Sequence, residues 1–427
     1  MATLNDSPSQ DGRAPSLAPF PVPTQVAFVA LATALMAVSY LDRQVFAVLS
    51  PTVTKELGIS DATYGLLAGT FSWAYLIGPP AAGVLLDRVG VRRGLVAAVL
   101  LWSTIAGMHA LCTGVATLFA LRFALGLAEA PSFPGAARLV HQAVPKETSP
   151  RAFGFLFTGS SLGAVVAPPL ATWMSARFGW RFAFIGTAVV GLAWIPVFVL
   201  LSRRAPEVFA RGDAEPSAHP RGGSAFRVLR EPAMWRGIAA ALAASPVAAF
   251  VFLWAPKLLV ARFGATQADL GRLLWIPPLM FDLGSVAFGD LASRARSRFS
   301  GQRAQVFLFG LAALLAMTLA LVPFADGTLL AAVLAGLALV GVGGISAINT
   351  STVLSAVPRD LVGVAAGTAA AAQSVAYIVA SAIVGRLVGS PRGYDLAVWG
   401  LAAWVVPGAL LWLAWEPMRR TLRPRSA

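Results

Sequence analysis

Four ionisable residues lie within long apolar stretches of the sequence. Asp42 and Arg43 are neighbours in one stretch, and Arg122 and Glu129 share another. A charged side chain at the centre of a bilayer costs at least about 2.5–3.5 kcal/mol, so such residues usually line a path for a substrate or a proton. Arginine binds carboxylates, whereas Asp and Glu can take up and release protons. We therefore predict an anion site with Arg43 and Arg122 as binding residues and Asp42 and Glu129 as proton-coupling residues.

Helical spacing predicts how these four residues are arranged. Arg122 and Glu129 are seven positions apart, which places them on one helix face with about 10 Å between them along the axis. Asp42 and Arg43 are expected at a depth similar to that of Arg122, so that two guanidinium groups could grip one carboxylate. Removal from water favours a protonated carboxyl group, and a nearby arginine favours the ionised form. The alternative is that the four residues form structural ion pairs between two helices.

The composition predicts an all-α membrane protein. Hydrophobic residues make up 57% of the chain, charged residues only 12%, and the mean hydropathy is +0.72; soluble domains contain about 25% charged residues. A bilayer-spanning helix needs about 20 apolar residues. Twelve segments qualify, approximately 24–49, 62–86, 94–113, 116–140, 152–175, 180–201, 235–257, 268–292, 304–323, 328–352, 361–386 and 394–415.

The distribution of basic residues predicts the orientation. The net charge is +14, but with the N-terminus inside, the loops and ends on that side hold 23 Lys and Arg residues against eight on the other side. This asymmetry follows the positive-inside rule and places both termini in the cytoplasm. The basicity therefore reflects topology, and no nucleic-acid partner is expected. The first 22 residues include Asp6 and Asp11, unlike a signal peptide, and are expected to be a disordered tail.

The chain divides into two halves of six spans. A long polar segment at 203–233 separates them, and Gly83–Arg88 after span two matches Gly289–Arg294 after span eight. Parallel six-span repeats place a substrate site near the midplane between the halves. The expected organisation is a disordered tail, an N-terminal six-helix bundle, a cytoplasmic linker, a C-terminal six-helix bundle and a basic cytoplasmic tail, at 1–22, 23–202, 203–233, 234–416 and 417–427.

Several motifs resemble a known family. The loop Gly83-x-Leu85-x-Asp87-Arg88-x-Gly90-x-Arg92-Arg93 is similar to the loop motif of the Major Facilitator Superfamily, whose members are twelve-helix secondary transporters. Further segments resemble its anion:cation symporter family, which includes hexuronate and other sugar-acid proton symporters, sialin and vesicular glutamate carriers. These segments are Tyr40-Leu-Asp-Arg43, Arg122–Gly135, Gly159–Ala164 with Ala167–Leu170, and Gly179-Trp-Arg181, followed more loosely by Trp254-Ala-Pro256 and Phe281–Gly284.

The resemblance implies a function and further site residues. It implies import of a small organic anion, such as a hexuronate or aldonate, with protons as the coupling ion and no other cofactor. The implied carrier is a monomer that spans the plasma membrane, most simply a bacterial inner membrane. Residues Gly83, Asp87, Arg88, Gly90, Arg92 and Arg93 would form a cytoplasmic gate motif, with simple positive-inside anchoring as the alternative. In span eleven, Ala370 and Ser374 stand where many members of the family carry asparagine. In span two, Pro79 stands where sugar-acid members often carry glutamine. The resemblance therefore does not determine which organic anion is the substrate.

Other polar residues are weaker candidates. Tyr40 and Tyr75 match cavity positions in similar carriers. Ser160 and Ser161 are candidates for binding a sugar hydroxyl, although small residues in membrane helices often serve close packing. Further candidates are Trp254, Asn349, Gln373, Ser374 and Tyr377, each with a structural role as the alternative. Asp282, expected to be buried in span eight, is a candidate third titrating site.

Other classes of protein fit the sequence less well. The sequence contains no set of nucleophile, base and oxyanion donors and no phosphate-binding loop that would indicate an enzyme. His109, His141 and His219 have no metal-ligand spacing and are expected to be interfacial or solvated. A proton-coupled drug or metabolite exporter of the same superfamily is the main alternative, but segment 159–169 lacks the paired glycines typical of such exporters. An uncoupled facilitator and a non-transporting receptor or scaffold are further alternatives; the latter would not need buried charges.

Overall fold

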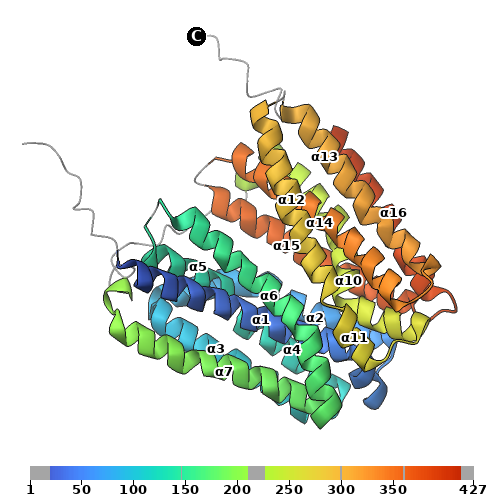
Figure 1. Cartoon of the computed structure of the whole chain (residues 1–427), viewed down its shortest axis with the longest axis horizontal. Helices are drawn as coiled ribbons and strands as arrows, with labels where there is room; N and C mark the ends of the chain where they lie inside the picture. Colours follow the sequence, from blue (N-terminus) through green and yellow to red (C-terminus); the bar gives the residue numbers. More distant parts are fainter. Residues whose placement is uncertain (1–19, 146, 210–226, 299–300, 359–360, 415–427) are drawn as a thin grey trace, which may run out of the picture.

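The regular structure is entirely helical within residues 20–145, 147–209, 227–298, 301–358 and 361–414, the part of the chain that the computed structural model describes. The helices form two bundles, one from each half of the chain (Figure 1). Most of the predicted N-terminal tail (1–22), the middle of the predicted linker (203–233) and the predicted C-terminal tail (417–427) lie outside the described residues.

The N-terminal half contains six predicted spans. They are formed by α1 (Val22–Glu56), α2 (Asp61–Val89), α3 (Val91–Met108) with the short 3-10 helix η1 (His109–Leu111), α4 (Val115–Glu129) with α5 (Ser132–Ala143), α6 (Ser149–Phe178) and α7 (Trp180–Arg204). The fourth span consists of two helices because Pro131 has no backbone N–H, which interrupts the hydrogen-bond ladder directly after Glu129.

The C-terminal half repeats this arrangement. Its spans are α10 (Pro232–Phe263), α11 (Gln267–Leu273) with α12 (Ile276–Arg298), α13 (Gly301–Ala316) with η2 (Met317–Phe324), α14 (Thr328–Ala356), α15 (Val362–Leu387) and α16 (Gly393–Ala414). Ten helical segments of the described chain are long and apolar enough to cross a membrane. The predicted spans 62–86 and 268–292 are also helical but fall outside these ten, because glycine, proline and polar residues lower their hydropathy.

Two glycines make single-residue connections between consecutive helices. Gly90 joins α2 to α3 with φ 76°, and Gly179 joins α6 to α7 with φ 85°. A residue with a side chain rarely adopts this left-handed region, whereas glycine does so without steric cost. Gly90 belongs to the loop motif at 83–93, and Gly179 belongs to the motif Gly179-Trp-Arg181. Backbone geometry therefore explains the glycine in each of these two motifs.

Small residues allow α1 and α6 to pack closely. A Cβ atom at Gly159 would collide with the carbonyl oxygen of Thr33, and one at Gly163 would collide with that of Ala37. Small residues at helix contacts are the usual means by which membrane helices approach each other. This contact fixes the position of α1, the helix that carries Asp42 and Arg43.

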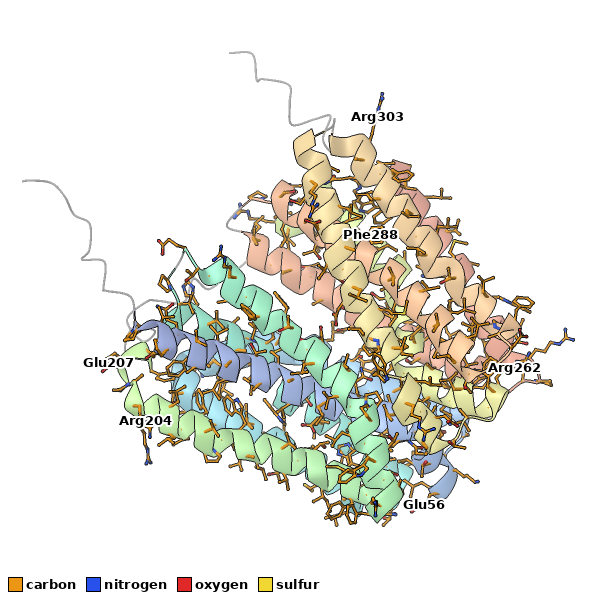
Figure 2. All side chains as sticks on the ribbon, in the orientation of Figure 1. Glu56, Arg204, Glu207, Arg262, Phe288 and Arg303 are labelled. Carbon is orange, nitrogen blue, oxygen red and sulfur yellow. The ribbon has the colours of Figure 1, made fainter. Side chains whose placement is uncertain are left out.

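The two halves are joined at the end of the molecule that topology places outside. Lys257 of α10 forms an ion pair with Asp61 of α2 at 2.8 Å and donates a hydrogen bond to Thr54 at 2.9 Å. The Tyr64 hydroxyl donates to the carbonyl oxygen of Leu253 at 2.6 Å. The ribbons of the two halves lie close here and diverge towards the chain termini (Figure 1). Figure 2 shows Glu56 and Arg262 at this joined end, away from Arg204 and Arg303.

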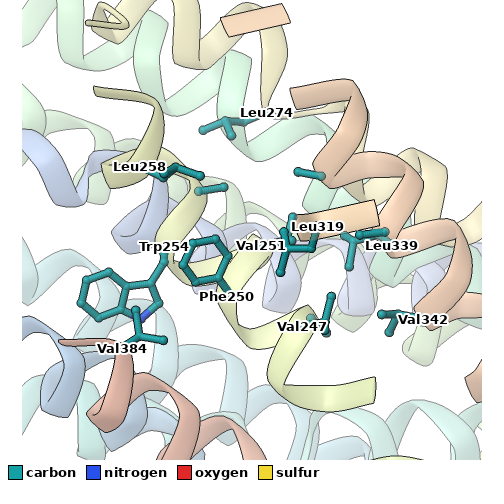
Figure 3. Close-up of a cluster of buried hydrophobic side chains, with 14 of the residues drawn as sticks. Val247, Phe250, Val251, Trp254, Leu258, Leu274, Leu319, Leu339, Val342 and Val384 are labelled. Carbon is teal, nitrogen blue, oxygen red and sulfur yellow. The ribbon is translucent and has the colours of Figure 1, made fainter. Parts of the chain in front are cut away.

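Apolar packing supports the joined end. Trp254 of α10 is fully buried, and its ring meets the Tyr64 ring edge to face at a centroid distance of 4.8 Å. Figure 3 shows Trp254 beside Val384 of α15, at one edge of a buried cluster that continues along α10 through Phe250 and Val247. The site residues therefore lie beneath a closed, largely apolar contact between the halves.

The close contact of α1 and α6 makes a stability prediction. Gly163→Ala is expected to lower the free energy of unfolding by about 1–3 kcal/mol, because the added methyl group forces α6 away from α1. Gly154→Ala is the matched control, since a Cβ atom there meets nothing within 4 Å and both variants gain the same helix propensity. Thermal unfolding in detergent measures both; equal midpoints for the two variants would contradict the packing argument.

Candidate functional site

An ion pair between Arg43 and Glu129 lies at the centre of the candidate site. Arg43 Nε is 2.8 Å from Glu129 Oε2, and the hydroxyl of Ser39 donates to the same oxygen at 2.9 Å. Arg43 Nη2 in turn donates to Ser39 at 3.2 Å. Ser39 precedes Arg43 by four residues, so one face of α1 supplies both partners of Glu129. Glu129 is completely buried, whereas 15% of the Arg43 side chain remains exposed.

Aromatic rings surround the Arg43 guanidinium group. Its Cζ atom lies 4.4 Å from the ring centroid of Tyr75, 4.8 Å from that of Tyr40 and 4.9 Å from that of Phe71. The negative faces of such rings attract a cation and hold it in a defined position. Lysine would not replace this arginine, because it lacks the planar group that stacks on the rings and donates in a fixed geometry.

Arg122 is buried in a different environment. Only 2% of it is exposed, and its Cζ atom lies 4.8 Å from the Phe46 ring and 5.3 Å from the Phe71 ring. Among the described residues it forms no ion pair, and its Nε and Nη1 atoms have no hydrogen-bond partner. Of the two arginines expected to bind one carboxylate, Arg43 is paired with Glu129 and Arg122 has two unpaired donors, and their joint binding of an anion stays a prediction.

Asp42 points to a different part of the bundle from Arg43. It is 3% exposed, and in the described structure neither carboxylate oxygen has a partner in hydrogen-bond geometry. The hydroxyl group of Thr187 of α7 influences the Asp42 carboxyl group but donates to the carbonyl oxygen of Phe184 at 3.3 Å. Consecutive residues of a helix point about 100° apart, which explains why Arg43 reaches Glu129 while Asp42 faces α7.

Several other predicted residues are connected to Tyr40. Ser160 of α6 interacts with the Tyr40 hydroxyl. Tyr377 of α15 is close enough to Tyr40 to affect it electrostatically, and Gln373 interacts with the Tyr377 hydroxyl. Tyr40 therefore connects the N-terminal half of the site to α15 of the other half.

Three further predicted residues have local partners. Ser161 interacts with Asp282 of α12, again across the two halves. Asp282 is only partly buried, so the expectation of a buried carboxylate there is wrong. Ser374 donates at 3.0 Å to the carbonyl oxygen of Ala370 in its own helix, which occupies its hydroxyl hydrogen.

Two predicted residues lie away from this group. Trp254 belongs to the closed outer contact described above, because it is packed against Tyr64. Asn349 of α14 is buried in the C-terminal half and donates to the carbonyl oxygen of Gly237 at 3.0 Å, tying α14 to α10. The structure thus places both in packing contacts between helices, which was the alternative for each.

The loop motif lies at the cytoplasmic end of the N-terminal half. Asp87 forms an ion pair with Arg138 of α5, and Arg138 also donates to the carbonyl oxygen of Gly83 at 3.5 Å. Arg88 and Arg93 are exposed and Arg92 is partly buried. Arg138 therefore joins the end of α2, which carries Gly83 and Asp87, to α5 of the same half. A role of the loop motif in gating stays a prediction.

Sequence reasoning missed four residues close to the four central ionisable residues: Ser39, Phe46, Phe71 and Thr187. Ser39 was detectable, since it lies one helical turn before Arg43 on the same face. Phe46 and Phe71 were not, because any apolar residue fits a membrane helix. His109 is completely buried, so the expectation of an interfacial or solvated histidine is wrong. The structure describes no group of three or more metal-ligating side chains in residues 20–414 outside its gaps.

Fold and site together define a class of protein. Two six-span bundles that enclose buried arginines and carboxylates near their contact are the architecture of a secondary transporter. Residues 32–381 match the Major Facilitator Superfamily, and the chain belongs to this family. The family assignment confirms the all-α membrane fold and agrees with a transporter rather than an enzyme.

Curated relatives are similar to the chain over much of its length. The hexuronate transporter of Escherichia coli (strain K12) is 28% identical over 278 residues, which is 62% of this chain and 64% of that protein, so slightly less than two thirds of that relative is matched. The probable galactarate/D-glucarate transporter GudP of Bacillus subtilis (strain 168) is 25% identical and covers 88% of each chain. These bacterial relatives and the apolar helices identify a multi-pass inner-membrane protein.

Solved structures show the same fold. A bacterial homologue of the human lysosomal transporter Spinster, in an inward-facing and unoccupied conformation, has a TM-score of 0.78 at 17% identity, covering 92% of this chain and 97% of that one. The nucleoside transporter NupG has a TM-score of 0.72 at 14% identity, covering 92% and 98%. At these identities the likeness concerns the fold alone.

The buried ion pair makes a second stability prediction. Arg43→Met is expected to destabilise the protein by about 3–5 kcal/mol, because it leaves the Glu129 carboxylate buried without its charged partner. Adding Glu129→Gln to Arg43→Met is expected to restore part of this loss, since a neutral amide needs no counter-charge. Thermal unfolding in detergent of both single variants and the double variant measures the coupling; additive effects would show that the pair is not a stabilising contact.

Proposed function

We propose that the protein imports a small organic anion of the sugar-acid class together with protons by alternating access. The observation that carries this proposal is that Arg43, fixed among three aromatic rings and partly exposed, is neutralised by a buried carboxylate that can be protonated. A substrate carboxylate and Glu129 are competitors for the same guanidinium group. Protonation of Glu129 would release Arg43 to bind the anion, which couples the two events.

Charge balance supports one proton for each negative charge on the substrate. Arg43 and Arg122 offset Asp42 and Glu129 when both acids are ionised, so the buried set is neutral without substrate. An anion adds one negative charge, and uncompensated charge in this low-dielectric interior is costly. One proton on Glu129 restores neutrality for a monoanion, and a second proton on Asp42 would do so for a dianion.

Arg122 is proposed as the second binding residue. Its two unpaired donors, buried against Phe46 and Phe71, can bind a carboxylate or a polar group in a charge-assisted manner. Phe71 contacts both guanidinium groups, so movement of its ring would affect Arg43 and Arg122 together. Tyr40, Tyr75, Ser160, Ser161, Gln373 and Tyr377 are the hydroxyl and amide groups nearby that fit the hydroxyl groups of a sugar acid.

The relatives support the substrate class. Transporters of hexuronate, galacturonate, galactarate or D-glucarate, and D-galactonate are among the similar proteins. The absence of the span-eleven asparagines at Ala370 and Ser374 leaves the choice among these acids to other residues of the C-terminal half. We propose that the protein works as a monomer, since each chain contains both halves of the site.

The direction and the coupling are tested by uptake into proteoliposomes. Labelled D-galacturonate, D-glucarate and D-galactonate are offered with the outside more acidic than the inside. An anion alone would have to climb an inside-negative potential that costs about 2.3 kcal/mol per charge per 100 mV, so uptake is expected to rise as external pH falls and to stop with a protonophore. Uptake that does not change when the proton gradient is removed would indicate the uncoupled facilitator. Accumulation inside the vesicles only when the inside is more acidic than the outside would indicate the exporter.

Replacement of Glu129 by glutamine separates binding from coupling. Glu129→Gln mimics the protonated acid at nearly the same volume, so substrate binding and substrate–substrate exchange are expected to persist. Accumulation driven by a pH gradient is expected to fall at least about tenfold, because the residue can no longer release a proton. The matched control is Glu56→Gln, at the outer end of α1, where the carboxylate pairs with Arg181. Wild-type accumulation by the Glu129→Gln protein would contradict the role of Glu129.

A further inference from the structure

A groove lies between α6 of the N-terminal half and α11 of the C-terminal half, at the joined outer end of the molecule. Figure 1 shows α11 beside the outer part of α6. The groove has a volume of about 750 Å³, and Arg272 is the one charged residue among the described residues that line it. Val166, Pro169 and Trp173 of α6 form one wall, and Arg272 and Trp275 form part of the other. The groove is therefore apolar, with a single cation.

The depth of the groove matches the outer interface of the bilayer. Helix α6 ends at Phe178, so Trp173 lies about 7.5 Å below the outer end of this helix. Trp173 is 55% exposed and Trp275 is 38% exposed. Tryptophan is enriched where the lipid headgroups meet the hydrocarbon region. Val166, which is 38% exposed, lies about 10 Å deeper along α6, at the depth of the acyl chains.

The guanidinium group of Arg272 is available to a ligand. Arg272 is exposed and forms no ion pair with another described residue. Asp269, three residues earlier, acts on it electrostatically, but Asp269 Oδ2 accepts hydrogen bonds from the backbone N–H and the hydroxyl of Thr266, at 2.9 and 2.6 Å. By contrast, Arg262 at the same end of the molecule is paired with Asp395 at 3.5 Å. Arg272 can therefore donate charge-assisted hydrogen bonds to a phosphate group beside the groove.

The groove is assembled from both halves at a point of close contact. A Cβ atom at Gly271 of α11 would lie 2.0 Å from Oγ1 of Thr172 in α6, so the two walls touch each other here. The Thr52 hydroxyl of α1 donates to Gln267 Oε1 of α11 at 2.9 Å, which holds α11 against the N-terminal half. Alternating access requires the halves to separate at this end. Separation would pull the two walls apart, so the groove belongs to the conformation that is closed on the outside.

We propose that this groove binds one phospholipid of the outer leaflet with an anionic headgroup, and that the bound lipid favours the conformation closed on the outside. The lipid phosphate lies against Arg272, the glycerol region lies between Trp173 and Trp275, and one acyl chain follows Val166 along α6. A zwitterionic headgroup carries its own cation beside the phosphate, so it gains less from Arg272 than an anionic headgroup does. The site is independent of the identity of the transported anion and of proton coupling.

Fluorescence quenching by brominated lipids tests the site locally. The full chain is reconstituted in vesicles of equal amounts of dioleoyl phosphatidylglycerol, which is anionic, and dioleoyl phosphatidylcholine, which is zwitterionic, with bromine on the acyl chains of one lipid at a time. The fluorescence of the two groove tryptophans is the difference between the chain and the same chain carrying Trp173→Phe and Trp275→Phe. Because one basic residue at the surface of a membrane favours an anionic lipid about fivefold, the phosphatidylglycerol is expected to be enriched by about this factor at the groove.

Two variants with matched controls test the two parts of the bound lipid. Arg272→Gln is expected to remove the preference for phosphatidylglycerol, whereas Arg392→Gln, at an exposed position of the outer loop between α15 and α16, is expected to keep it. Val166→Phe fills the groove and is expected to lower the preference. Val189→Phe, at a position of α7 that is 57% exposed, is expected to leave the preference unchanged. Thermal unfolding in detergent checks that each variant is folded.

A further variant tests the link to the closed conformation. Asp61→Asn removes the ion pair with Lys257 that joins the halves at the outer end, and Asp61 is not among the residues that line the groove. Opening of this end is expected to lower the preference for phosphatidylglycerol, because binding and closure affect each other reciprocally. The change in net charge alone would act in the opposite direction, since Asp61→Asn makes the protein more positive.

The outcomes separate the site from its conformational effect. Equal quenching by the two lipids in the wild type, or a preference that Arg272→Gln leaves intact, overturns the site. An equal loss in Arg272→Gln and Arg392→Gln shows a general attraction of anionic lipid to a basic protein and overturns the site as well. A preference that is unchanged in Asp61→Asn overturns the link to the closed conformation alone. Failure of the protein to transport sugar acids would overturn the proposed function and leave each of these results standing.

Discussion

The ion pair of Arg43 and Glu129 is the interaction on which the arrangement of the site depends. A fully buried carboxylate is tolerated only beside a cation and further donors, which Arg43 and Ser39 supply from one face of α1. Three aromatic rings hold the cation, and two of them, Tyr75 and Phe71, come from α2. The pair therefore positions α1, α2 and α4 relative to one another, and any event that neutralises Glu129 changes the partners available to Arg43.

Close helix packing is what makes this geometry reproducible. Gly159 and Gly163 bring α6 against the backbone of α1, so the helix that carries Ser39, Asp42 and Arg43 has little freedom to rotate. Pro131 interrupts the fourth span directly after Glu129, at the level of the ion pair. A rigid α1 beside an interrupted α4 combines a fixed cation with a locally adaptable acid. This combination fits the proposed alternation between an ionised and a protonated Glu129.

The two acids of the site occupy different environments. Glu129 is bound to Arg43 and Ser39, whereas Asp42 faces Thr187 in the interior of the N-terminal bundle. Across the halves, the site is connected through Tyr40 with Tyr377 and through Ser161 with Asp282.

The sequence by itself determined the membrane class, the helical spans, the two-half organisation and the identity of the four central ionisable residues. Each of these follows from local composition, because hydropathy and the cost of a charge in hydrocarbon act on single segments. The position of Ser39 beside Arg43 was also predictable, because residues four apart lie on the same face of a helix. Only the tertiary structure decided that Arg43 pairs with Glu129, that Arg122 has no acidic partner among the described residues, that Trp254 and Asn349 pack between helices and that His109 is buried. Partner choice depends on which helix faces are brought together, and neighbouring residues such as Asp42 and Arg43 can face different helices because they point about 100° apart.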